Sequence, residues 1–224
     1  MRTLYHTSLS PNCRKIRILL REKELEFEQV IENFWDRRTE FFALNPAGEV
    51  PVLLEPDGQT ICGNYSITEY LEEAYRDNNK RFLGGSIGER TEIRRLVDWF
   101  DDKFNREVTQ NIVFEKVFKR LLRCGEPQSD AIRAGKKNIL YHLEYIAFLT
   151  QEHRFLGGDM LTLADMTAAA HFSTLDYLGD VPWDHNAKAK EWYALMKSRP
   201  SVRSVLSDRV AAFQPPAHYE NPDF

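Results

Sequence analysis

The chain has 224 residues, of which 42% are hydrophobic, so it can bury a sizeable core as one large domain or two small ones. It carries 30 Lys and Arg against 34 Asp and Glu, and the net charge of -4 argues against nucleic acid as the main partner, because phosphate binding needs a basic excess on one face. No apolar run approaches the roughly 20 residues that a helix needs to span a bilayer, so we expect no membrane insertion.

The N-terminus and the cysteines predict a cytoplasmic protein. Residues 1–7 run directly into a strand pattern and contain no apolar core of a signal peptide. The three cysteines are widely spaced and odd in number, which indicates neither a disulfide framework nor a zinc site. Cys13 follows Ser10 by three positions, like a C-x-x-C motif without its first cysteine, so we expect Cys13 to have a packing role rather than a redox role.

The first third of the chain alternates between strand and helix patterns. Apolar residues at positions 16, 18, 19 and 20, with basic residues between them, predict an amphipathic helix. Asp57-Gly58 is a hairpin signal that joins the last two predicted strands. The expected order is βαβαββα, with the elements at residues 3–6, 13–23, 27–31, 37–44, 50–54, 60–62 and 66–75. This order predicts a small mixed sheet covered by helices.

The rest of the chain is predicted to be helical. Residues 78–89 are polar and contain glycine, so we interpret them as a linker between a domain at 1–77 and a domain at 90–213. The remaining residues, 214–224, form a tail, because Pro215-Pro216 cannot continue a helix. Helical spacing of apolar residues recurs in the second domain at residues 91–124, 129–151, 163–178, 187–198 and 201–213.

Four short motifs carry a family resemblance. They are SPNCRK at residues 10–15, NPAGEVPVL at 45–53, ITEYL at 67–71 and TLAD at 162–165. Each motif alone is weakly specific, but the second and the fourth together are highly specific. Through them the chain resembles the glutathione S-transferase superfamily over about residues 1–213. The resemblance implies an α/β plus all-α fold, in which a thioredoxin-like domain precedes a helical bundle.

The resemblance also implies a glutathione site made by Ser10, Val50, Pro51, Gly63 and Asn64. In catalytic relatives a Ser, Cys or Tyr near position 10 donates a hydrogen bond to the glutathione sulfur, and the helix N-terminus further favours the thiolate. Ser10 is therefore the candidate catalytic residue, although the same serine fits a plain helix N-cap. In the family the bond before Pro51 is cis, which turns the backbone of Val50 toward the cysteinyl part of glutathione.

The pair Gly63-Asn64 departs from the family pattern. Many members have Glu-Ser or Asp-Ser here, and these residues hold the γ-glutamyl carboxylate of glutathione. Asn64 retains a hydrogen-bond donor, whereas Gly63 offers only its backbone. Loss of a charge-assisted hydrogen bond of about 1.5–3 kcal/mol weakens binding roughly ten-fold or more. We therefore expect glutathione to bind weakly or not at all.

The loop after the second predicted strand has the sequence Phe34-Trp35-Asp36-Arg37-Arg38. Trp and Arg dominate binding hot spots, so Trp35, Arg37 and Arg38 are candidate partner-binding residues. Alternatively, Trp35 folds over the glutathione groove and forms one of its walls.

The tail carries Tyr219 and a terminal Phe224 in a Pro-rich segment. A solvated tail rarely needs aromatic residues, so the tail either packs on its own domain or serves as a short motif for a partner. In the second case Tyr219, Asp223 and Phe224 are the candidate contacts.

The aromatic loop and the tail together resemble one non-detoxifying branch of the superfamily, the GST-like division proteins of alphaproteobacteria, which bind the tubulin-like GTPase FtsZ. This resemblance implies a homodimer that binds FtsZ filaments or other division proteins and has a degraded glutathione site. The alternative is a catalytic transferase that conjugates glutathione to electrophiles, with Ser10 activating the thiol. A glutathione-dependent reductase is disfavoured, because position 10 holds no cysteine. The fold alone does not choose among these functions.

Overall fold

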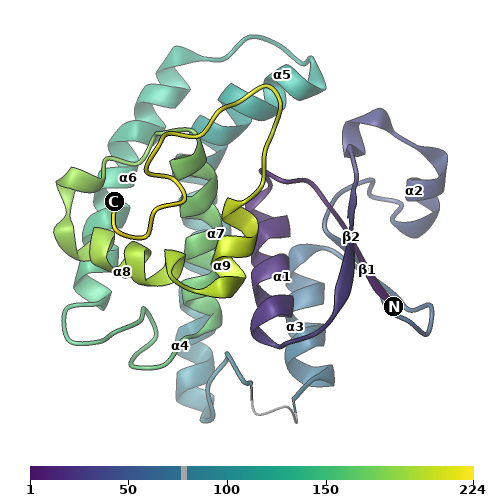
Figure 1. The fold of residues 1–224 in the computed structure, drawn as a ribbon, viewed down its shortest axis with the longest axis horizontal. Helices are drawn as coiled ribbons and strands as arrows, with labels where there is room; N and C mark the ends of the chain where they lie inside the picture. The colour runs from purple at the N-terminus through teal and green to yellow at the C-terminus, as the bar shows by residue number, and fades with distance from the viewer. Residues whose placement is uncertain (77–79) are drawn as a thin grey trace.

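The computed structural model describes residues 1–76 and 80–224, and consists of an α/β part followed by a helical part (Figure 1). The predicted order βαβαββα is confirmed, with one short 3-10 helix inserted before the second α-helix. The elements of the first part are β1 (Arg2–His6), α1 (Pro11–Glu22), β2 (Phe27–Ile31), η1 (Phe34–Asp36), α2 (Thr39–Leu44), β3 (Val52–Leu54), β4 (Thr60–Cys62) and α3 (Asn64–Ala74).

The strands form one mixed sheet in the order β2-β1-β3-β4. β1 pairs with β2 in parallel and with β3 antiparallel, and β3 and β4 form the predicted antiparallel hairpin. Helices α1 and α3 cover one face of the sheet, and α2 lies on the other side (Figure 1). The sheet is therefore enclosed on the face that meets the helical part.

The helical part begins earlier than expected, because Ile87 lies within the segment that we interpreted as linker and is already the first residue of α4. Ser86 starts this helix through a capping box: its Oγ accepts from the N–H of Glu89 at 3.1 Å, and the Glu89 carboxylate accepts from the N–H of Ser86 at 2.8 Å. The elements are α4 (Ile87–Asp98), the π-helical η2 (Trp99–Phe118), α5 (Lys119–Leu122), α6 (Ser129–Leu149), α7 (Leu163–Tyr177), η3 (Trp183–His185), α8 (Ala187–Lys197) and α9 (Pro200–Leu206).

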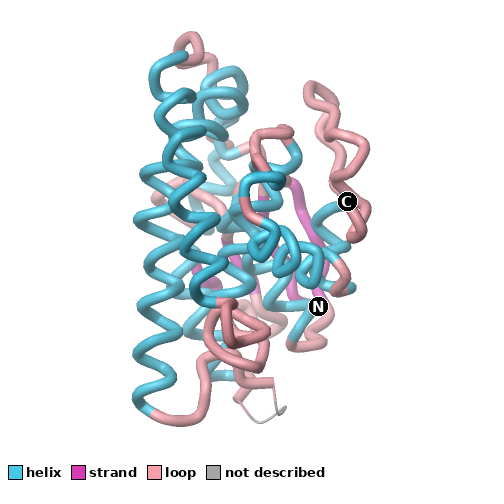
Figure 2. Tube along the Cα trace, turned by 90° about the vertical axis from the view of Figure 1, so that its left-hand side faces the viewer, coloured by secondary structure: helices cyan, strands magenta, loops and turns pink. Residues whose placement is uncertain are grey.

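The elements α4, η2 and α5 continue into one another as a single long helix, since the residues at both junctions have helical dihedral angles. Figure 2 shows the long helices standing side by side along one edge of the molecule. Within the described residues, none of the helices is both long and apolar enough to cross a membrane.

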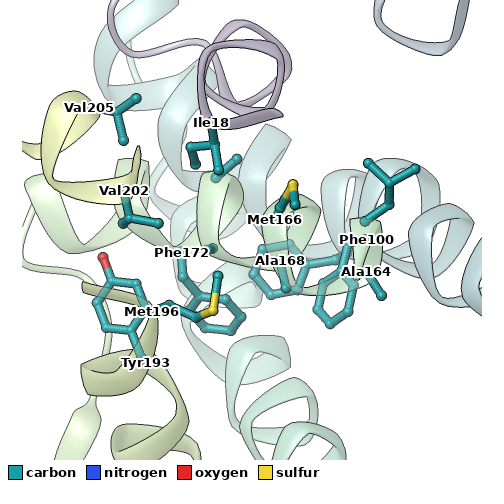
Figure 3. Packing of buried hydrophobic residues seen from close by; sticks show 14 of the residues in the cluster. Ile18, Phe100, Ala164, Met166, Ala168, Phe172, Tyr193, Met196, Val202 and Val205 are labelled. Atoms are coloured by element: carbon teal, nitrogen blue, oxygen red, sulfur yellow. The ribbon is translucent and has the colours of Figure 1, made fainter. Parts of the chain in front are cut away.

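One hydrophobic cluster runs through both parts of the chain. Helix α7 lies at its centre, and every residue of α7 is buried. Ile18 of α1, Phe100 of η2 and Phe172 of α7 all belong to this cluster (Figure 3). Because the core is continuous, the N-terminus of α1 and the long helix have a fixed relation to each other.

An amphipathic helix would place its basic residues on a solvent-exposed face, but three of the four basic residues of α1 are buried, and only Arg21 among these four is exposed. Arg14, Lys15 and Arg17 are at most 3% exposed. Lys15 pairs with Asp101 of η2 at 2.7 Å, and Arg17 pairs with Asp208 at 2.6 Å. The physical reason is that α1 is covered by the sheet on one side and by the helical part on the other, so that its cations are satisfied by acids from the second part.

Candidate functional site

Ser10 caps the helix whose N-terminus the predicted site needs. Its Oγ accepts a hydrogen bond from the backbone N–H of Cys13 at 3.4 Å, and Pro11 occupies the first helical position. The capping role of Ser10 is therefore confirmed. This bond does not use the hydroxyl proton. A hydrogen bond from Ser10 to a thiolate stays a prediction.

Cys13 lies in the first turn of the same helix and is fully buried. Burial raises the pKa of its thiol to about 11, although hydrogen bonds from its surroundings oppose this effect. Because the thiolate is the reactive form of cysteine, both the burial and the raised pKa disfavour reaction of Cys13 at neutral pH. Its environment supports the expected packing role.

Val50, Pro51 and Gly63 come together where β3 begins and β4 ends. The Val50–Pro51 peptide bond is cis, as the family resemblance implied. The backbone N–H of Gly63 donates to the carbonyl oxygen of Pro51 at 3.1 Å. Gly63 has a φ of 88°, a backbone conformation that favours glycine. The backbone conformation therefore favours glycine at position 63, where many family members have an acidic residue.

Asn64, the first residue of α3, is bonded to the helical part of the same chain. Its Nδ2 donates to Asp101 Oδ2 at 2.9 Å, and the same oxygen accepts from Lys15 Nζ at 2.7 Å. His171 of α7 places its Nε2 3.5 Å from Asp101 Oδ1. One of the two N–H donors of the amide that the resemblance assigned to glutathione is thus used within the chain.

Asp101 is the acid at the centre of this arrangement. Burial by itself raises its pKa, but the Lys15 ammonium and the imidazole of His171 outweigh this effect and hold the pKa of Asp101 well below its usual range. Asp101 is therefore charged, and Lys15 compensates that charge. Asn64 Oδ1 is a buried acceptor without a partner among the residues that the structure describes.

These contacts show how far the site fits glutathione. Ser10 and the cis bond at Pro51 match what the cysteinyl part requires. The γ-glutamyl part is matched less well, because Gly63 has no side chain and Asp101 takes one of the two N–H donors of Asn64 Nδ2.

The aromatic loop closes on the helical part. Trp35 lies in η1, is half-buried, and packs edge-on against Phe34 with ring centroids 5.1 Å apart. Phe34 in turn lies 6.2 Å from the ring of Phe118, the last residue of η2. Trp35 is thus held beside the junction of the two parts and keeps a free surface. This placement is compatible with both predicted roles of Trp35, as a wall of the glutathione groove and as a contact for a partner protein.

The two arginines of the loop differ in their electrostatic environment. Arg38 forms an ion pair with Glu32 at 2.5 Å, and the Glu32 side chain is only 1% exposed. Arg37 is exposed, and its guanidinium lies over the ring of Phe42 at 5.4 Å. Within the described part of the chain, no carboxylate pairs with Arg37. The charge of Arg37 is therefore the more available of the two.

The tail packs back onto its own chain, which was one of the two alternatives. Tyr219 is fully buried, and its hydroxyl accepts a hydrogen bond from Arg14 Nη1 at 2.9 Å. Its ring lies edge-on to that of Tyr177 at 5.1 Å. The expectation that Tyr219 contacts a partner is corrected for this conformation, because a fully buried ring that satisfies a buried arginine has no surface to offer.

The end of the tail is held by a cation and aromatic rings. Lys197 Nζ lies 3.8 Å from the ring centroid of Phe224, and the ring of Trp183 lies edge-on to Phe224 at 5.3 Å. Phe224 is half-buried, whereas Asp223 is exposed. Asp223 is therefore the predicted tail contact that is most accessible from outside.

Sequence reasoning missed Asp101, Lys15 and Arg14, which connect the candidate site to the helical part. Charged residues inside predicted helices are common, so the sequence contained no specific signal for them; the one indication was the group of basic residues among the apolar positions of α1. In residues 1–76 and 80–224, no group of three or more His, Cys, Asp or Glu is arranged to hold a metal ion.

Comparison with known proteins identifies the family. A family model described as "Glutathione S-transferase, N-terminal domain" matches residues 9–74. The solved structure of a glutathione S-transferase from Rhodospirillum rubrum F11 is similar with a TM-score of 0.96 and 54% sequence identity over 100% of both chains. The chain belongs to the glutathione S-transferase family, which confirms the resemblance inferred from the motifs.

Within this family, the chain is similar to FtsZ-localized protein A of Caulobacter vibrioides, with 44% identity over 100% of this chain and 98% of the relative. The solved structure of FzlA from C. crescentus matches with a TM-score of 0.94 and 43% identity over 100% of this chain and 99% of that one. A glutathione S-transferase of Hyoscyamus muticus is more distant, with 29% identity over 93% of this chain and 92% of the relative.

Proposed function

We propose that this protein is a regulatory binding protein of bacterial cell division that engages FtsZ filaments in the cytoplasm. The observation that carries the proposal is the 44% identity, over the whole chain, to a protein named for its localisation to FtsZ. The aromatic loop supports it, because Trp35 and Arg37 are surface residues of the types that dominate protein interfaces.

The geometry of the glutathione-like site supports a binding protein rather than an enzyme. The bond from Asn64 to Asp101 takes one of the two N–H donors of the Asn64 amide, and Gly63 has no side chain that could add a contact. A ligand that lacks a charge-assisted hydrogen bond at this end gains less free energy on binding. We infer that glutathione, if it binds, does so weakly.

We further propose a homodimer. A two-fold dimer presents each partner-binding surface twice, and bivalency strengthens attachment to a filament without any new contact. The exposed aromatic side chains of Tyr65 at the start of α3 and Tyr141 on α6 support such an association, since each exposes a large apolar surface that a second copy would cover.

Co-sedimentation with FtsZ polymers tests the proposal. We expect the wild type to pellet with the polymers, and Trp35→Ala to weaken the association at least about ten-fold, because truncation of an aromatic hot spot costs about 2 kcal/mol or more. The matched control is Met160→Ala, which removes an exposed apolar side chain from the loop before α7. A wild type that never pellets with FtsZ would remove the proposed partner.

Isothermal titration with glutathione tests the weakened site separately. We expect a dissociation constant in the millimolar range, since the γ-glutamyl end lacks its charge-assisted contacts. A dissociation constant in the low micromolar range would show that the site is intact and would contradict the argument from Gly63 and Asn64.

A second candidate function is catalytic glutathione transfer, which the position of Ser10 at the N-terminus of α1 favours. Conjugation of glutathione to a model electrophile, abolished in Ser10→Ala and retained in Ser8→Ala, would establish this activity. Because Ser10 is also an N-cap, the folded state of the variant must be verified by circular dichroism.

A further inference from the structure

A surface hollow at the end of the long helix formed by α4, η2 and α5 is lined mostly by basic residues. It has a volume of about 680 Å³ and lies at α5 (Figure 1). The described residues that line it are Lys116, Lys119, Arg120, Arg123, Gly125, Glu126 and Pro127. The other three cations follow Lys116 by three, four and seven positions, which places all four on one face of the helix. A hollow of this volume suits a small ligand.

The lysines of the hollow are only partly compensated by neighbouring acids. Lys116 at 2.5 Å and Lys136 at 3.0 Å share the one carboxylate of the buried Asp180. Lys119 pairs with Glu115 at 2.7 Å. Three lysines are thus matched by two carboxylates.

The two arginines of the hollow have no carboxylate partner. The guanidinium of Arg120 lies over the ring of Phe213 at 5.7 Å, a contact that leaves its charge uncompensated. Neither Arg120 nor Arg123 forms an ion pair with any residue of the described ranges. Glu126, the one acid that lines the hollow, is exposed. The five cations therefore exceed the three acids by two charges, in a chain whose net charge is -4.

The backbone at Arg123 adds a second observation. Arg123 follows α5 with a φ of 51°. Glycine is the usual residue after a helix in this left-handed conformation, because a side chain there is sterically unfavourable. In the part of the chain that the structure describes, the Arg123 side chain makes neither a hydrogen bond nor an ion pair. The fold therefore does not require an arginine at this position, and unfavourable backbone conformations of this kind cluster at ligand-binding sites.

The chemistry of the lining indicates which ligand would bind. The described residues that line the hollow include no aromatic or large aliphatic side chain, so it lacks the apolar anchor on which a protein partner usually depends. Guanidinium groups bind phosphate oxygens through paired, charge-assisted hydrogen bonds, and lysines add point charges. The row from Lys116 to Arg123 spans about 10 Å along the helix axis, which suits several linked phosphates better than one.

We propose that this hollow binds a small soluble ligand that carries two or more phosphate groups. Arg123 contacts the phosphates directly, and the other cations of the row hold the remaining negative charge. The site goes beyond the proposed function, because it does not depend on FtsZ.

Isothermal titration with inorganic tripolyphosphate tests the site. We expect saturable binding by the wild type, with an affinity that falls as salt is added, because exposed ionic contacts are screened. Arg123→Gly should lower the affinity roughly ten-fold, which is the effect of one lost charge-assisted hydrogen bond. Glycine also relieves the backbone at this position, so the variant should unfold in urea at the same concentration as the wild type or a higher one. A loss of binding in Arg123→Gly is then not a folding defect.

Two further variants complete this titration. Arg120→Gln should also weaken the binding of tripolyphosphate. Lys188→Gln is the control, because it removes one positive charge from an exposed position on α8 that does not line the hollow. The proposal is overturned if the wild type does not bind, if Arg123→Gly binds as well as the wild type, or if Lys188→Gln loses as much affinity as Arg123→Gly.

Flotation with phosphatidylglycerol vesicles tests whether the phosphates belong to a lipid instead. We expect the wild type to remain unbound to these vesicles at a salt concentration at which it binds tripolyphosphate. Flotation of the wild type that Arg123→Gly abolishes would assign the hollow to lipid headgroups and overturn the soluble ligand.

Discussion

Removal of the Asp101 carboxylate is expected to destabilise the protein through the lysine that it leaves behind. Lys15 is 1% exposed, and its Nζ lies 2.7 Å from Asp101 Oδ2. In Asp101→Ala this ammonium stays buried at the junction of the two parts without its counter-ion, and the amide of Asn64 also loses its acceptor. The loss of stability comes more from the buried, unpaired charge of Lys15 than from the lost attraction between Lys15 and Asp101.

The structure sets the size of this effect. Removal of one partner from a buried pair costs about 3–5 kcal/mol. The Asp101 side chain retains 21% of its exposure, so water can partly solvate the site, and the lower end of about 3 kcal/mol applies. In a protein of this size about 3 kcal/mol corresponds to a fall in Tm of roughly 6–12 °C.

Urea unfolding followed by tryptophan fluorescence measures this cost. The matched control is Asp102→Ala, because Asp102 is exposed and pairs with Arg106 on the same helix face, a contact worth less than about 1 kcal/mol. A double variant, Lys15→Met/Asp101→Leu, should recover most of the loss by replacing the ion pair with apolar contacts. If Asp101→Ala costs no more than Asp102→Ala, the unpaired-charge argument is wrong.

Three further predictions follow from buried groups elsewhere. Tyr219→Phe removes an acceptor from the fully buried Arg14 and should lower the free energy of unfolding by about 1.5–3 kcal/mol; an unchanged urea midpoint would show that this hydrogen bond does not stabilise the fold. Burial lowers the pKa of His6 from 6.5 to about 4, so its neutral form is favoured in the folded state, and stability should fall as the pH drops from about 6.5 toward 4. His6→Gln should flatten that part of the pH profile, and a slope identical to wild type would contradict this assignment. Because burial raises the pKa of Cys13 to about 11, iodoacetamide at neutral pH should label the exposed Cys124 before Cys13, a sequence of events that mass spectrometry of the labelled peptides would confirm or refute.

Much of the fold was predictable because its signals are local. The first part alternates between strand and helix patterns, and after it the apolar residues keep helical spacing alone, which marks where the helical part begins. Asp57-Gly58 predicted the β3–β4 hairpin, and the motif at residues 45–53, which contains Pro51, helped to identify the family and with it the cis bond. The start of α4 at Ile87 was missed, because the capping box at Ser86 lies in a polar segment that resembles a linker.

The candidate site was predicted less well than the fold. Family motifs predicted Ser10, Pro51, Gly63 and Asn64 as one site, and their joint role in binding glutathione stays a prediction; the partner of Asn64 was not predicted. Asp101 lies 37 positions from Asn64, and no spacing rule connects the two. For the same reason, the sequence did not decide whether the tail packs on its own domain or binds a partner.

The sequence by itself determined the order of the elements, the family, and the absence of an acidic residue at position 63, because each of these depends on neighbouring residues or on a short motif. Only the tertiary structure decided that Arg14, Lys15 and Arg17 of α1 are buried, that Asn64 donates to Asp101, and that Tyr219 lies inside the molecule. These outcomes depend on which surfaces meet when the two parts pack, and the bond from Arg14 to Tyr219 joins residues 205 positions apart. The identity of a charged residue does not show whether its side chain faces water or a buried counter-ion, because this depends on how the elements pack.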